Sequence, residues 1–567
     1  MDHRENQPLR IVIVGGVAGG ASAATRARRV NEEAQIILFE KDAHVSFANC
    51  GLPYYIGGEI SRREKLLVAT PELFRERFNI DVRTRQEVLA IDRKRRVVQV
   101  VNHATGERYE QPYDRLILAP GASPIVPPMA GVDGPNVFTL RNLADTDEIV
   151  GWIRQRQPER AVVVGAGFIG LEMVEQLVRR GLSVSLVELQ DQVLPPLDPE
   201  MAYPLHEELE RHGVSLHLGT GIAGLTLAAD GWAAGVQLDN GDELPADLVV
   251  LGLGVRPNVA LAKDAGLTLG SQGGIAVNAH LQTSDPAIYA VGDAVEYTFG
   301  PTGAPMRVPL AGPANRAGRL AGEHAATGRG QPMAPVMGTA IVRVFEQTAA
   351  STGLSLKLAR RLNVAAASVT ITANHHAGYF PGAQPMTLKL IYAPDTGRIL
   401  GAQAVGRAGV DKRMDVIATA MRFNGTVRDL AGVDLAYAPP FGSAKDPVQL
   451  AAFAASNQLD GLVDFTPADA DLSGVQVVDV RTEREVARDP LVGVEQVVVL
   501  PLDELRDRLN ELDPQQPTVV ACRSGMRSYV AARMMREHGF TQVSSLDGGQ
   551  VVRRRALRAG EVVQRQH

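Results

Sequence analysis

Cysteine is scarce in this chain, which has two cysteines, Cys50 and Cys522, among 567 residues. Two thiols cannot build the multi-disulfide framework of a small secreted domain, so each cysteine needs a chemical explanation of its own. Long apolar runs are also missing. No stretch approaches the roughly 20 residues that span a bilayer, and the N-terminal "MDHRENQPLR" lacks a signal-peptide core. We therefore expect a cytoplasmic protein without a membrane span.

An excess of positive charge is absent as well. The chain has 58 lysines and arginines against 64 aspartates and glutamates, and its net charge of −6 gives no general attraction to a phosphate backbone. Hydrophobic residues make up 45% and charged residues 22%, as in ordinary soluble proteins. The length predicts about three to five domains. We expect no nucleic-acid partner and no metal site.

Two similar segments are the main positive signal. Residues Arg10 to Asp42 read as a strand, a glycine turn, a helix and a second strand that ends on Glu40. Residues Arg160 to Asp191 repeat this order and end on Glu188. Each segment has the pattern of a Rossmann unit, so the repeat predicts two dinucleotide sites in tandem.

The second segment carries a complete GxGxxG at Gly165, Gly167 and Gly170. These glycines permit the tight turn that brings a pyrophosphate to a helix N-terminus. Glu188 is placed to bind both ribose hydroxyls and to repel a 2′-phosphate, and no arginine follows it directly. The pattern predicts an NADH site and leaves NADPH possible. We also expect Glu172 among the cofactor contacts.

The first segment departs from this fingerprint because Val17 occupies the second glycine position. A side chain there should crowd a pyrophosphate unless the turn is reshaped, so the stretch alone also fits a purely structural turn. The later "AVGDA" favours a flavin, because Asp293 at a strand end can bind a ribityl chain. The predicted FAD contacts are Gly15, Val17, Ala18, Gly19, Gly20, Glu40, Lys41, Gly121 and Asp293.

Beyond about Gly338 the pattern changes. Alternating stretches such as "TAIVRVF" and "MTLKLIYAP" are typical of an antiparallel sheet. Beyond Asn457 we expect a linker, followed by a small α/β domain that contains "GVQVVDVR" and "PTVVACRSGMRS".

Several motifs together resemble one enzyme family. Over about residues 9–450 the chain resembles flavoprotein disulfide reductases. The features that carry this resemblance are the two dinucleotide units, "GVRPN", the Gly-Asp turn and the sheet-rich domain, in this order along the chain. The motifs "GGVAGG", "SFANCGLPYY" and "YAPPFGSAKDP" resemble the branch of coenzyme A disulfide reductases and NADH-dependent persulfide reductases. The resemblance implies an FAD-containing homodimer in which each subunit completes its neighbour's active site.

Cys50 lies in "SFANCGLPYY", where Asn, Gly and Pro predict a turn into a helix. A helix N-terminus or hydrogen-bond donors lower the pKa of a thiol, so we expect a reactive Cys50 facing the flavin. Oxidase and peroxidase relatives form a sulfenic acid at this position, whereas the coenzyme A branch forms a mixed disulfide or persulfide with an external thiol. "NCGLPYY" resembles the second branch. An inert buried cysteine is the remaining interpretation.

Further site residues are implied by the resemblance. Arginines suit phosphates as bidentate donors. Phe78 stands where some relatives carry a lysine, which leaves that contact undetermined. Tyr379 and Tyr437 match paired active-site tyrosines of the partner subunit, although each also fits an ordinary packed tyrosine. The residues that match coenzyme A contacts are Arg26, Arg29, Ser46, Phe47, Asn49, Asn315 and Lys445.

Cys522 ends an apolar strand and precedes a helix, in "VVACRSGMRS". A loop of this kind turns backbone N–H groups toward the sulfur and stabilises a thiolate or persulfide. It resembles the rhodanese loop, and Arg527 follows Cys522 at the spacing that suits sulfur rather than phosphate. The tryptophan usual after "DGG" is absent, so an altered last helix and a degenerate binding domain stay open. The predicted loop residues are Arg523, Ser524, Gly525, Met526 and Arg527.

The predicted fold is therefore α/β. It comprises two Rossmann-like domains for FAD (1–150 and 281–333) and NAD(P)H (151–280), an α+β dimerisation domain (334–455) and a rhodanese-like α/β domain (456–567). We predict an NAD(P)H-dependent flavoprotein that reduces coenzyme A persulfide, or related low-molecular-weight persulfides and polysulfides. Alternatives are a coenzyme A disulfide reductase, an NADH oxidase and a redox-sensing binding protein.

Overall fold

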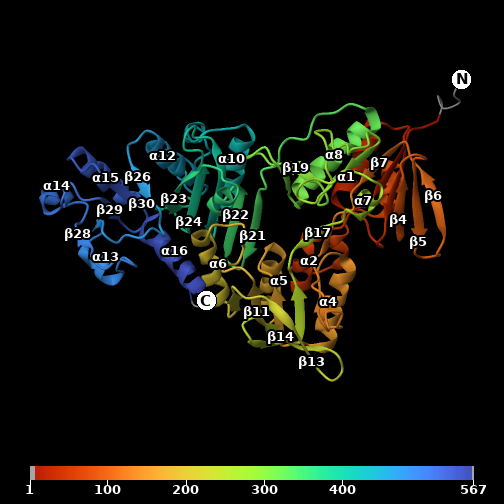
Figure 1. Cartoon of the computed structure of the whole chain (residues 1–567), viewed down its shortest axis with the longest axis horizontal. Coiled ribbons are helices and arrows are strands. Elements are labelled where there is room, and N and C mark those ends of the chain that lie inside the picture. Colours follow the sequence, from red (N-terminus) through yellow and green to blue (C-terminus); the bar gives the residue numbers. More distant parts are fainter. Residues whose placement is uncertain (1–6, 565–567) are drawn as a thin grey trace.

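This computed structural model describes residues 7–564, and its first and last domains are each built around a parallel sheet (Figure 1). The first segment and the part inserted after it lie at the right and bottom of the view. The sheet-rich domain occupies the middle, and the last α/β domain lies at the left.

The first parallel sheet has the strand order β18-β7-β1-β2-β3. Its central strand is fully buried at Ile11, Val12 and Ile13, which explains the unbroken apolar run. Helices α1 and α8 pack side by side, and a Cβ on Gly318 would lie 2.1 Å from the Gly19 carbonyl oxygen. The elements are β1 (Arg10–Val14), α1 (Ala18–Val30), β2 (Gln35–Glu40), η1 (Asn49–Gly51), α2 (Leu52–Gly57), η2 (Arg63–Leu66), α3 (Pro71–Phe78), β3 (Asp81–Thr84), β7 (Arg115–Leu118), α7 (Ala260–Asp264), β18 (Ile288–Ala290) and α8 (Ala311–Thr327).

Smaller sheets surround this core. The antiparallel order β4-β5-β6 joins β4 (Gln86–Asp92), β5 (Val97–Asn102) and β6 (Arg108–Pro112). Two-stranded pairs join β8 (Ala122–Pro124) to β17 (Val255–Pro257) and β19 (Glu296–Thr298) to β20 (Pro305–Arg307).

The second parallel sheet, with the order β12-β11-β10-β16-β9, confirms the predicted repeat. Its strand β10 pairs with β11 and β16 as β1 pairs with β2 and β7. The sheet also takes in β9, which precedes residue 151. The elements are β9 (Val137–Phe138), α4 (Leu143–Arg156), β10 (Arg160–Val164), α5 (Phe168–Arg179), β11 (Ser183–Glu188), α6 (Pro199–Arg211), β12 (Ser215–Leu218), β13 (Ile222–Leu227), β14 (Ala233–Leu238), β15 (Glu243–Pro245) and β16 (Leu248–Leu251).

The third large sheet is antiparallel, with the order β21-β22-β25-β24-β23, as the alternating pattern predicted. Helices α10, α11 and α12 bury their apolar faces on it, for example through Met414, Leu430 and Val448. The elements are β21 (Ala340–Val344), β22 (Gln347–Gly353), α9 (Leu356–Arg361), β23 (Ala367–Asn374), β24 (Pro385–Tyr392), β25 (Ile399–Gly406), α10 (Val410–Arg422), α11 (Val427–Ala431) and α12 (Pro447–Leu459).

The last domain has a parallel sheet, β26-β30-β29-β27-β28. The predicted linker beyond Asn457 is reduced to residues 460–462, because α12 runs to Leu459 and Val463 is already buried in the core of the last domain. The elements are β26 (Asp464–Thr466), β27 (Gln476–Asp479), α13 (Glu483–Arg488), β28 (Val498–Val499), α14 (Leu505–Arg508), η3 (Leu509–Glu511), β29 (Thr518–Ala521), α15 (Met526–Glu537), β30 (Val543–Leu546) and α16 (Gly549–Gln564).

Polar contacts fasten the last domain to the rest of the chain. Helix α16 packs against α6 (Figure 1). Thr370 in β23 donates to the buried Asp547 carboxylate from its backbone N–H (2.7 Å) and its hydroxyl (2.8 Å). Burial raises the pKa of Asp547 to about 6. Arg555 donates to the Thr387 hydroxyl at 3.0 Å. The last domain thus packs directly against the rest of the chain and is not joined to it by the connecting segment alone.

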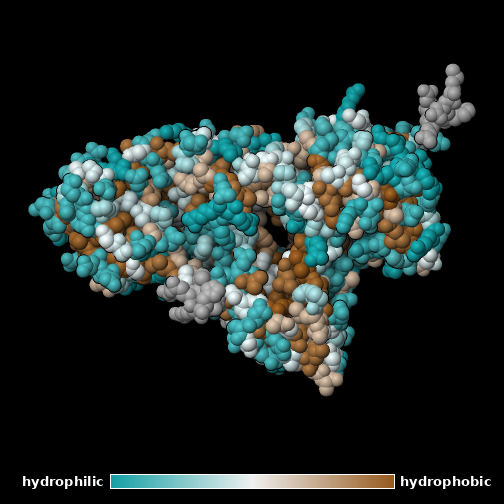
Figure 2. Space-filling view, in the orientation of Figure 1, coloured by the Kyte–Doolittle hydropathy of each residue, from teal (hydrophilic) through white to brown (hydrophobic). Residues whose placement is uncertain are grey.

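Figure 2 shows a largely hydrophilic face, with hydrophobic residues gathered over the part that contains α5, β13 and β14. Across residues 7–564, the structure contains no helix with the length and apolar character of a membrane span.

Candidate functional site

Cys50 is exposed and lies in η1, directly before α2, as the predicted turn into a helix requires. The chain reaches this turn through Ser46, whose φ of 48° is a left-handed conformation that non-glycine residues rarely adopt. The Ser46 N–H donates to the Gly16 carbonyl at 2.8 Å, and its own carbonyl accepts from Val68 at 3.0 Å. These bonds hold a strained residue beside the cysteine, which is common at functional sites.

A cavity of about 380 Å³ opens at Cys50, between α1, α8 and the segment that bears the cysteine. Four predicted substrate contacts, Ser46, Phe47, Asn49 and Asn315, line it. The remaining wall is mostly apolar, including Val17, Ala21, Val68, Leu73, Phe74 and Phe78. Apolar walls with a few convergent polar groups are typical of small-molecule sites.

A second cavity, of about 280 Å³, continues from the first because both include Ser22, Thr25 and Asn315. Four arginines line it: Arg26 and Arg29 from α1, and Arg316 and Arg319 from α8. The sequence reasoning missed Arg316 and Arg319, although "NRAGR" spaces them for one helix face. The cavity that Cys50 lines thus adjoins a second cavity lined by a basic cluster.

The two predicted arginines have different surroundings. Arg26 forms an ion pair with Glu323 at 2.6 Å, which partly offsets its charge. The Arg29 guanidinium lies 5.4 Å from the ring centroid of Phe78. Phe78, in place of the lysine of some relatives, therefore contacts an arginine of the basic cluster through its ring.

The expected low pKa of the Cys50 thiol is wrong for the protein residues alone. Although the residue is exposed, partial burial of its thiol raises the pKa of Cys50, and the carboxylates of Glu172 and Asp293 raise it further. The Arg141 guanidinium opposes this shift. Because Glu172 and Asp293 lie far from Cys50 in the sequence, the local motif could not reveal their effect.

Glu172, expected at the nicotinamide nucleotide site, lies close to the cysteine as well. Tyr54 of α2 donates from its hydroxyl to Glu172 at 3.0 Å. Burial raises the pKa of both groups, and the Glu172 charge raises that of Tyr54 further. The Arg343 guanidinium lies 5.3 Å from the Tyr54 ring centroid. A fixed pair of titratable groups therefore lies beside Cys50.

The two Rossmann turns have matching carboxylates. Glu40 accepts from the Gly16 N–H at 2.8 Å and from the Asp42 N–H at 3.0 Å. Glu188 accepts from the Ala166 N–H at 2.7 Å and from the Gln190 N–H at 2.9 Å. Each carboxylate is oriented by its own turn and retains lone pairs for ribose hydroxyls.

Close packing explains the outer glycines of both turns. A Cβ on Gly20 would lie 1.8 Å from the Gly15 carbonyl oxygen, and one on Gly170 would lie 1.8 Å from that of Gly165. The Val17 side chain packs against the hydrophobic cluster of Phe47 and Leu52 and lines the Cys50 cavity. The turns therefore fit two dinucleotides, and the valine has an apolar environment.

The other predicted FAD contacts are consistent with this fit. Asp293 follows β18 and pairs with Arg141 at 3.2 Å. Gly121 has a φ of 66°, and a Cβ there would lie 3.0 Å from the Arg141 guanidinium. Lys41 is exposed directly after Glu40. Ala18 and Gly19 begin α1.

Tyr379 and Tyr437 lie on two loops of the sheet-rich domain, and their hydroxyl oxygens are 3.0 Å apart. Both side chains are exposed, at 75% and 49%. Lys445 is exposed on the same loop as Tyr437. An ordinary packed tyrosine would be covered, so this exposed pair favours the functional interpretation.

Cys522 of the last domain is 1% exposed, at the end of β29. Its sulfur accepts from the Gly525 N–H at 3.2 Å and donates to the Ser528 hydroxyl at 3.4 Å. Arg527 forms a bidentate pair with Glu485 (2.7 and 2.8 Å) and lowers the pKa of Glu485 to about 2. The predicted loop thus contributes one backbone donor to the sulfur among the described residues.

The first turn of α16 also holds the Cys522 loop by hydrogen bonds. The N–H groups of Gln550 and Val551 donate to the carbonyls of Cys522 (2.8 Å) and Arg523 (3.1 Å). Ser524 and Met526 complete the loop, and the Met526 side chain is 59% exposed. Helix α16 runs from Gly549 to Gln564, so a regular last helix forms without the usual tryptophan.

Three family models match successive parts of this chain. Residues 9–314 match the pyridine nucleotide-disulphide oxidoreductase model, 339–447 the dimerisation domain of the same family, and 467–551 a rhodanese-like domain. The chain belongs to the pyridine nucleotide-disulphide oxidoreductase family. Members of this family are FAD- and NAD(P)H-dependent oxidoreductases, which agrees with the two turns described above.

Three relatives within this family are similar to this chain over most of its length. The coenzyme A disulfide reductase of Staphylococcus haemolyticus (strain JCSC1435) is 37% identical over 446 residues, 79% of this chain and 99% of that protein. Reduced Bacillus anthracis CoADR-RHD is 46% identical, with a TM-score of 0.93 over 97% of this chain and 98% of the other. An NAD-dependent persulfide reductase from A. fulgidus is 37% identical, with a TM-score of 0.89 over 96% and 100%.

Glu188 makes the cofactor preference of this family member testable. Glu188→Ala would remove the ribose hydrogen bonds that we predict for this carboxylate, and hydrogen bonds to a charged group are worth about 1.5–3 kcal/mol each, so we expect the KM for NADH to rise roughly tenfold or more. It also removes the charge that repels a 2′-phosphate, so the preference over NADPH should narrow. Steady-state kinetics with both cofactors measure this.

The matched control is Glu188→Gln, which keeps the shape of the side chain. It should relax the discrimination against NADPH more than it weakens NADH. An unchanged cofactor ratio in both variants would contradict the assignment of Glu188.

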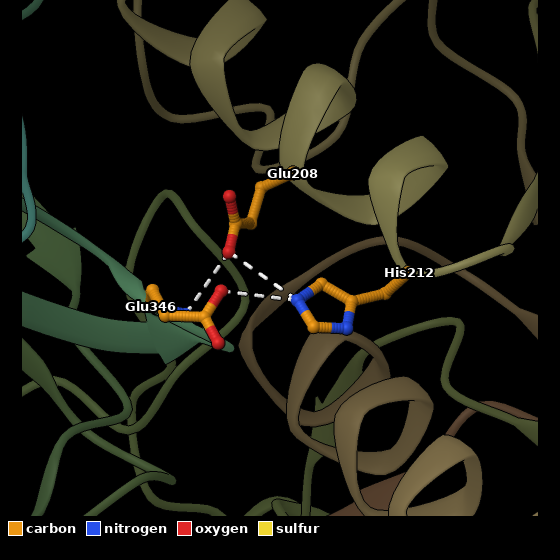
Figure 3. Close-up of side chains that lie close together, drawn as sticks. All are labelled: Glu208, His212 and Glu346. Atoms are coloured by element: carbon orange, nitrogen blue, oxygen red, sulfur yellow. Dashed lines mark hydrogen bonds and ion pairs between the residues drawn. The ribbon is translucent and has the colours of Figure 1, made fainter.

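One side-chain cluster has the composition of a metal site. Glu208, His212 and Glu346 have ligand atoms within 4.8 Å of one another (Figure 3). His212 lies 3.0 Å from Glu346 and 3.6 Å from Glu208. Arg211 pairs with both carboxylates, and the His212 ring stacks on Phe345. These contacts join α6 to the β21–β22 turn, so the cluster is accounted for as an ion-pair network.

Proposed function

We propose that this protein is an NAD(P)H-dependent flavoprotein that reduces coenzyme A persulfide, or a related sulfane sulfur, at Cys50. The supporting observation is the pair of adjoining cavities, one lined by the exposed Cys50 and the other by four arginines. A long thiol with an apolar middle and a phosphorylated end matches this arrangement. We assign the phosphates to the arginines and the sulfur to Cys50.

The reaction balances as follows. A persulfide R–S–SH, NADH and one proton give R–SH, H₂S and NAD⁺. When bound, FAD would accept a hydride from NADH and pass two electrons to the sulfur. The Cys50 thiolate attacks the inner sulfur of the persulfide and HS⁻ leaves, forming a Cys50–S–S–R disulfide, whose reduction returns both thiols. Because the protein residues alone raise the pKa of Cys50, we assign ionisation of the thiol to the loaded site.

The tyrosine pair suits the protonation of leaving thiolates. Its exposure in one chain agrees with a homodimer in which Tyr379, Tyr437 and Lys445 complete the partner subunit's cavity. A cytoplasmic location agrees with two free cysteines and a nicotinamide reductant.

Cys522 is assigned to carry sulfane sulfur, held by the Gly525 N–H and the Ser528 hydroxyl. Cys522 would transfer this sulfur to, or accept it from, the coenzyme A thiol that also reacts at Cys50. The names of the Bacillus and A. fulgidus relatives, which align over nearly the whole chain, support this combination. The predicted domain boundaries separate the parts of the chain to which we assign FAD binding, NAD(P)H binding, dimerisation and sulfur transfer.

Reduction of coenzyme A disulfide is the second candidate, because the Staphylococcus relatives carry that name over 79% of this chain. Neither an NADH oxidase nor a non-enzymatic sensor is favoured. The NADH oxidase of Lactobacillus brevis is 27% identical and covers 80% of this chain.

Anaerobic turnover of the FAD holoenzyme separates the two candidates. With NADH and coenzyme A persulfide we expect one sulfide released per NADH consumed, at a kcat/KM at least several-fold above that for coenzyme A disulfide. A clear preference for the disulfide would overturn the proposal in favour of the second candidate.

A further inference from the structure

A buried ion pair connects the two loops that carry the exposed tyrosines. Arg413, in the first turn of α10, forms a bidentate pair with Asp446 at 2.7 and 3.2 Å. The side chains are 2% and 4% exposed. Burying both charges is costly, so the site must be fully hydrogen-bonded to persist.

The Arg413 guanidinium also contacts the first tyrosine loop directly. Its Nη2 donates to the His375 carbonyl at 2.5 Å, and its Nη1 donates to the Gly409 carbonyl at 3.2 Å. His375 begins the loop that carries Tyr379 and leads back to β24. One guanidinium therefore serves a carboxylate and two backbone carbonyls.

Asp446 anchors the second loop. It caps α12 by accepting from the Val448 N–H at 3.0 Å, and it directly follows Lys445. The two loops meet where the Ala377 N–H donates to the Gly442 carbonyl at 2.9 Å. The loop of Tyr437 thus begins after α11 and ends at the ion pair.

The backbone is shaped around this guanidinium. Gly409 has a φ of 72°, and a Cβ there would lie 2.3 Å from Arg413 Nη1 and 3.0 Å from the His375 Cβ. A lysine at position 413 would keep the charge but lose the planar fork that reaches several acceptors at once.

We propose that Arg413 is a positioning residue for the tyrosine pair. Through Asp446 and the His375 carbonyl it fixes the loop of Tyr379 against that of Tyr437, so that the two hydroxyls stay within hydrogen-bond distance. The inference rests on the proposed function, which gives these tyrosines their role in turnover.

Arg413→Lys in the FAD holoenzyme tests this. Since displacement of a catalytic group by about 1 Å costs up to roughly 100-fold, we expect kcat for sulfide release to fall on the order of 10- to 100-fold. Flavin reduction by NADH, followed by stopped flow, should stay within about twofold of the unmodified enzyme. Arg481→Lys is the matched control, because Arg481 is equally buried and pairs with Asp479 in the last domain. It should leave sulfide release unchanged.

A mutant cycle separates positioning from general destabilisation. In a Tyr379→Phe/Tyr437→Phe background, Arg413→Lys should have little further effect, because the groups it positions are gone. An equal loss in both backgrounds, or no loss in the unmodified enzyme while the double phenylalanine variant is impaired, overturns the positioning role and leaves the proposed function intact. Full turnover by the double phenylalanine variant refutes the tyrosine role and the inference with it. Asp446→Asn repeats the test if Arg413→Lys does not fold.

Discussion

Replacing Cys50 with serine is expected to abolish sulfide release while the flavin is still reduced by NADH. The Cys50 side chain is exposed at the head of the cavity and contributes no packed core, so serine should fold normally. The Rossmann turns, with Glu40 and Glu188, lie on other segments and stay unchanged. Serine cannot accept a sulfur and release it again, so the loss should be on the order of 1000-fold or more.

Two measurements on the same preparation decide the role of Cys50. Anaerobic stopped flow follows bleaching of the flavin by NADH, and a sulfide assay follows turnover with coenzyme A persulfide. Glu64→Gln, at an exposed residue of the nearby η2 that does not line the cavity, is the control for local disturbance and should retain Cys50 chemistry. Sulfide release by Cys50→Ser at a rate near that of the unmodified enzyme would remove Cys50 from the mechanism.

Much of the fold could be predicted because its signals are local. The strand-turn-helix units around Gly15 and Gly165, the alternating strands after Gly338 and the loop at Cys522 are each set by residues close together in sequence. The same applies to the predicted contacts Ser46, Phe47 and Asn49, which line one cavity with Cys50 because they share its turn.

Other features depend on residues that only the tertiary structure brings together. Arg316 and Arg319 join Arg26 and Arg29 because α8 packs on α1, which required the glycine contacts between these helices. The raised pKa of Cys50 comes from burial and from a carboxylate on α5. The connection after α12 is also shorter than the linker predicted beyond Asn457, because α12 continues to Leu459 and Val463 packs in the core of the last domain.

The second large effect is expected at Cys522. Cys522→Ser should abolish transfer of sulfur from thiosulfate to cyanide, by on the order of 1000-fold or more, because no thiol remains to carry the persulfide. The substitution nearly preserves size, and the hydroxyl can take the hydrogen bonds of Gly525 and Ser528, so the domain should stay folded.

The position of Cys522 makes the result specific. Its loop is closed by Gln550 and Val551 of the docked last domain, while Cys50 lies in a separate cavity on α1 and α8. Reduction of free coenzyme A persulfide by Cys522→Ser should therefore continue at close to the normal rate, whereas Cys50→Ser should retain sulfur transfer. If Cys522→Ser instead lost both activities while remaining folded, every persulfide would have to pass through Cys522 before reaching Cys50, and the order of the two cysteines proposed here would be wrong.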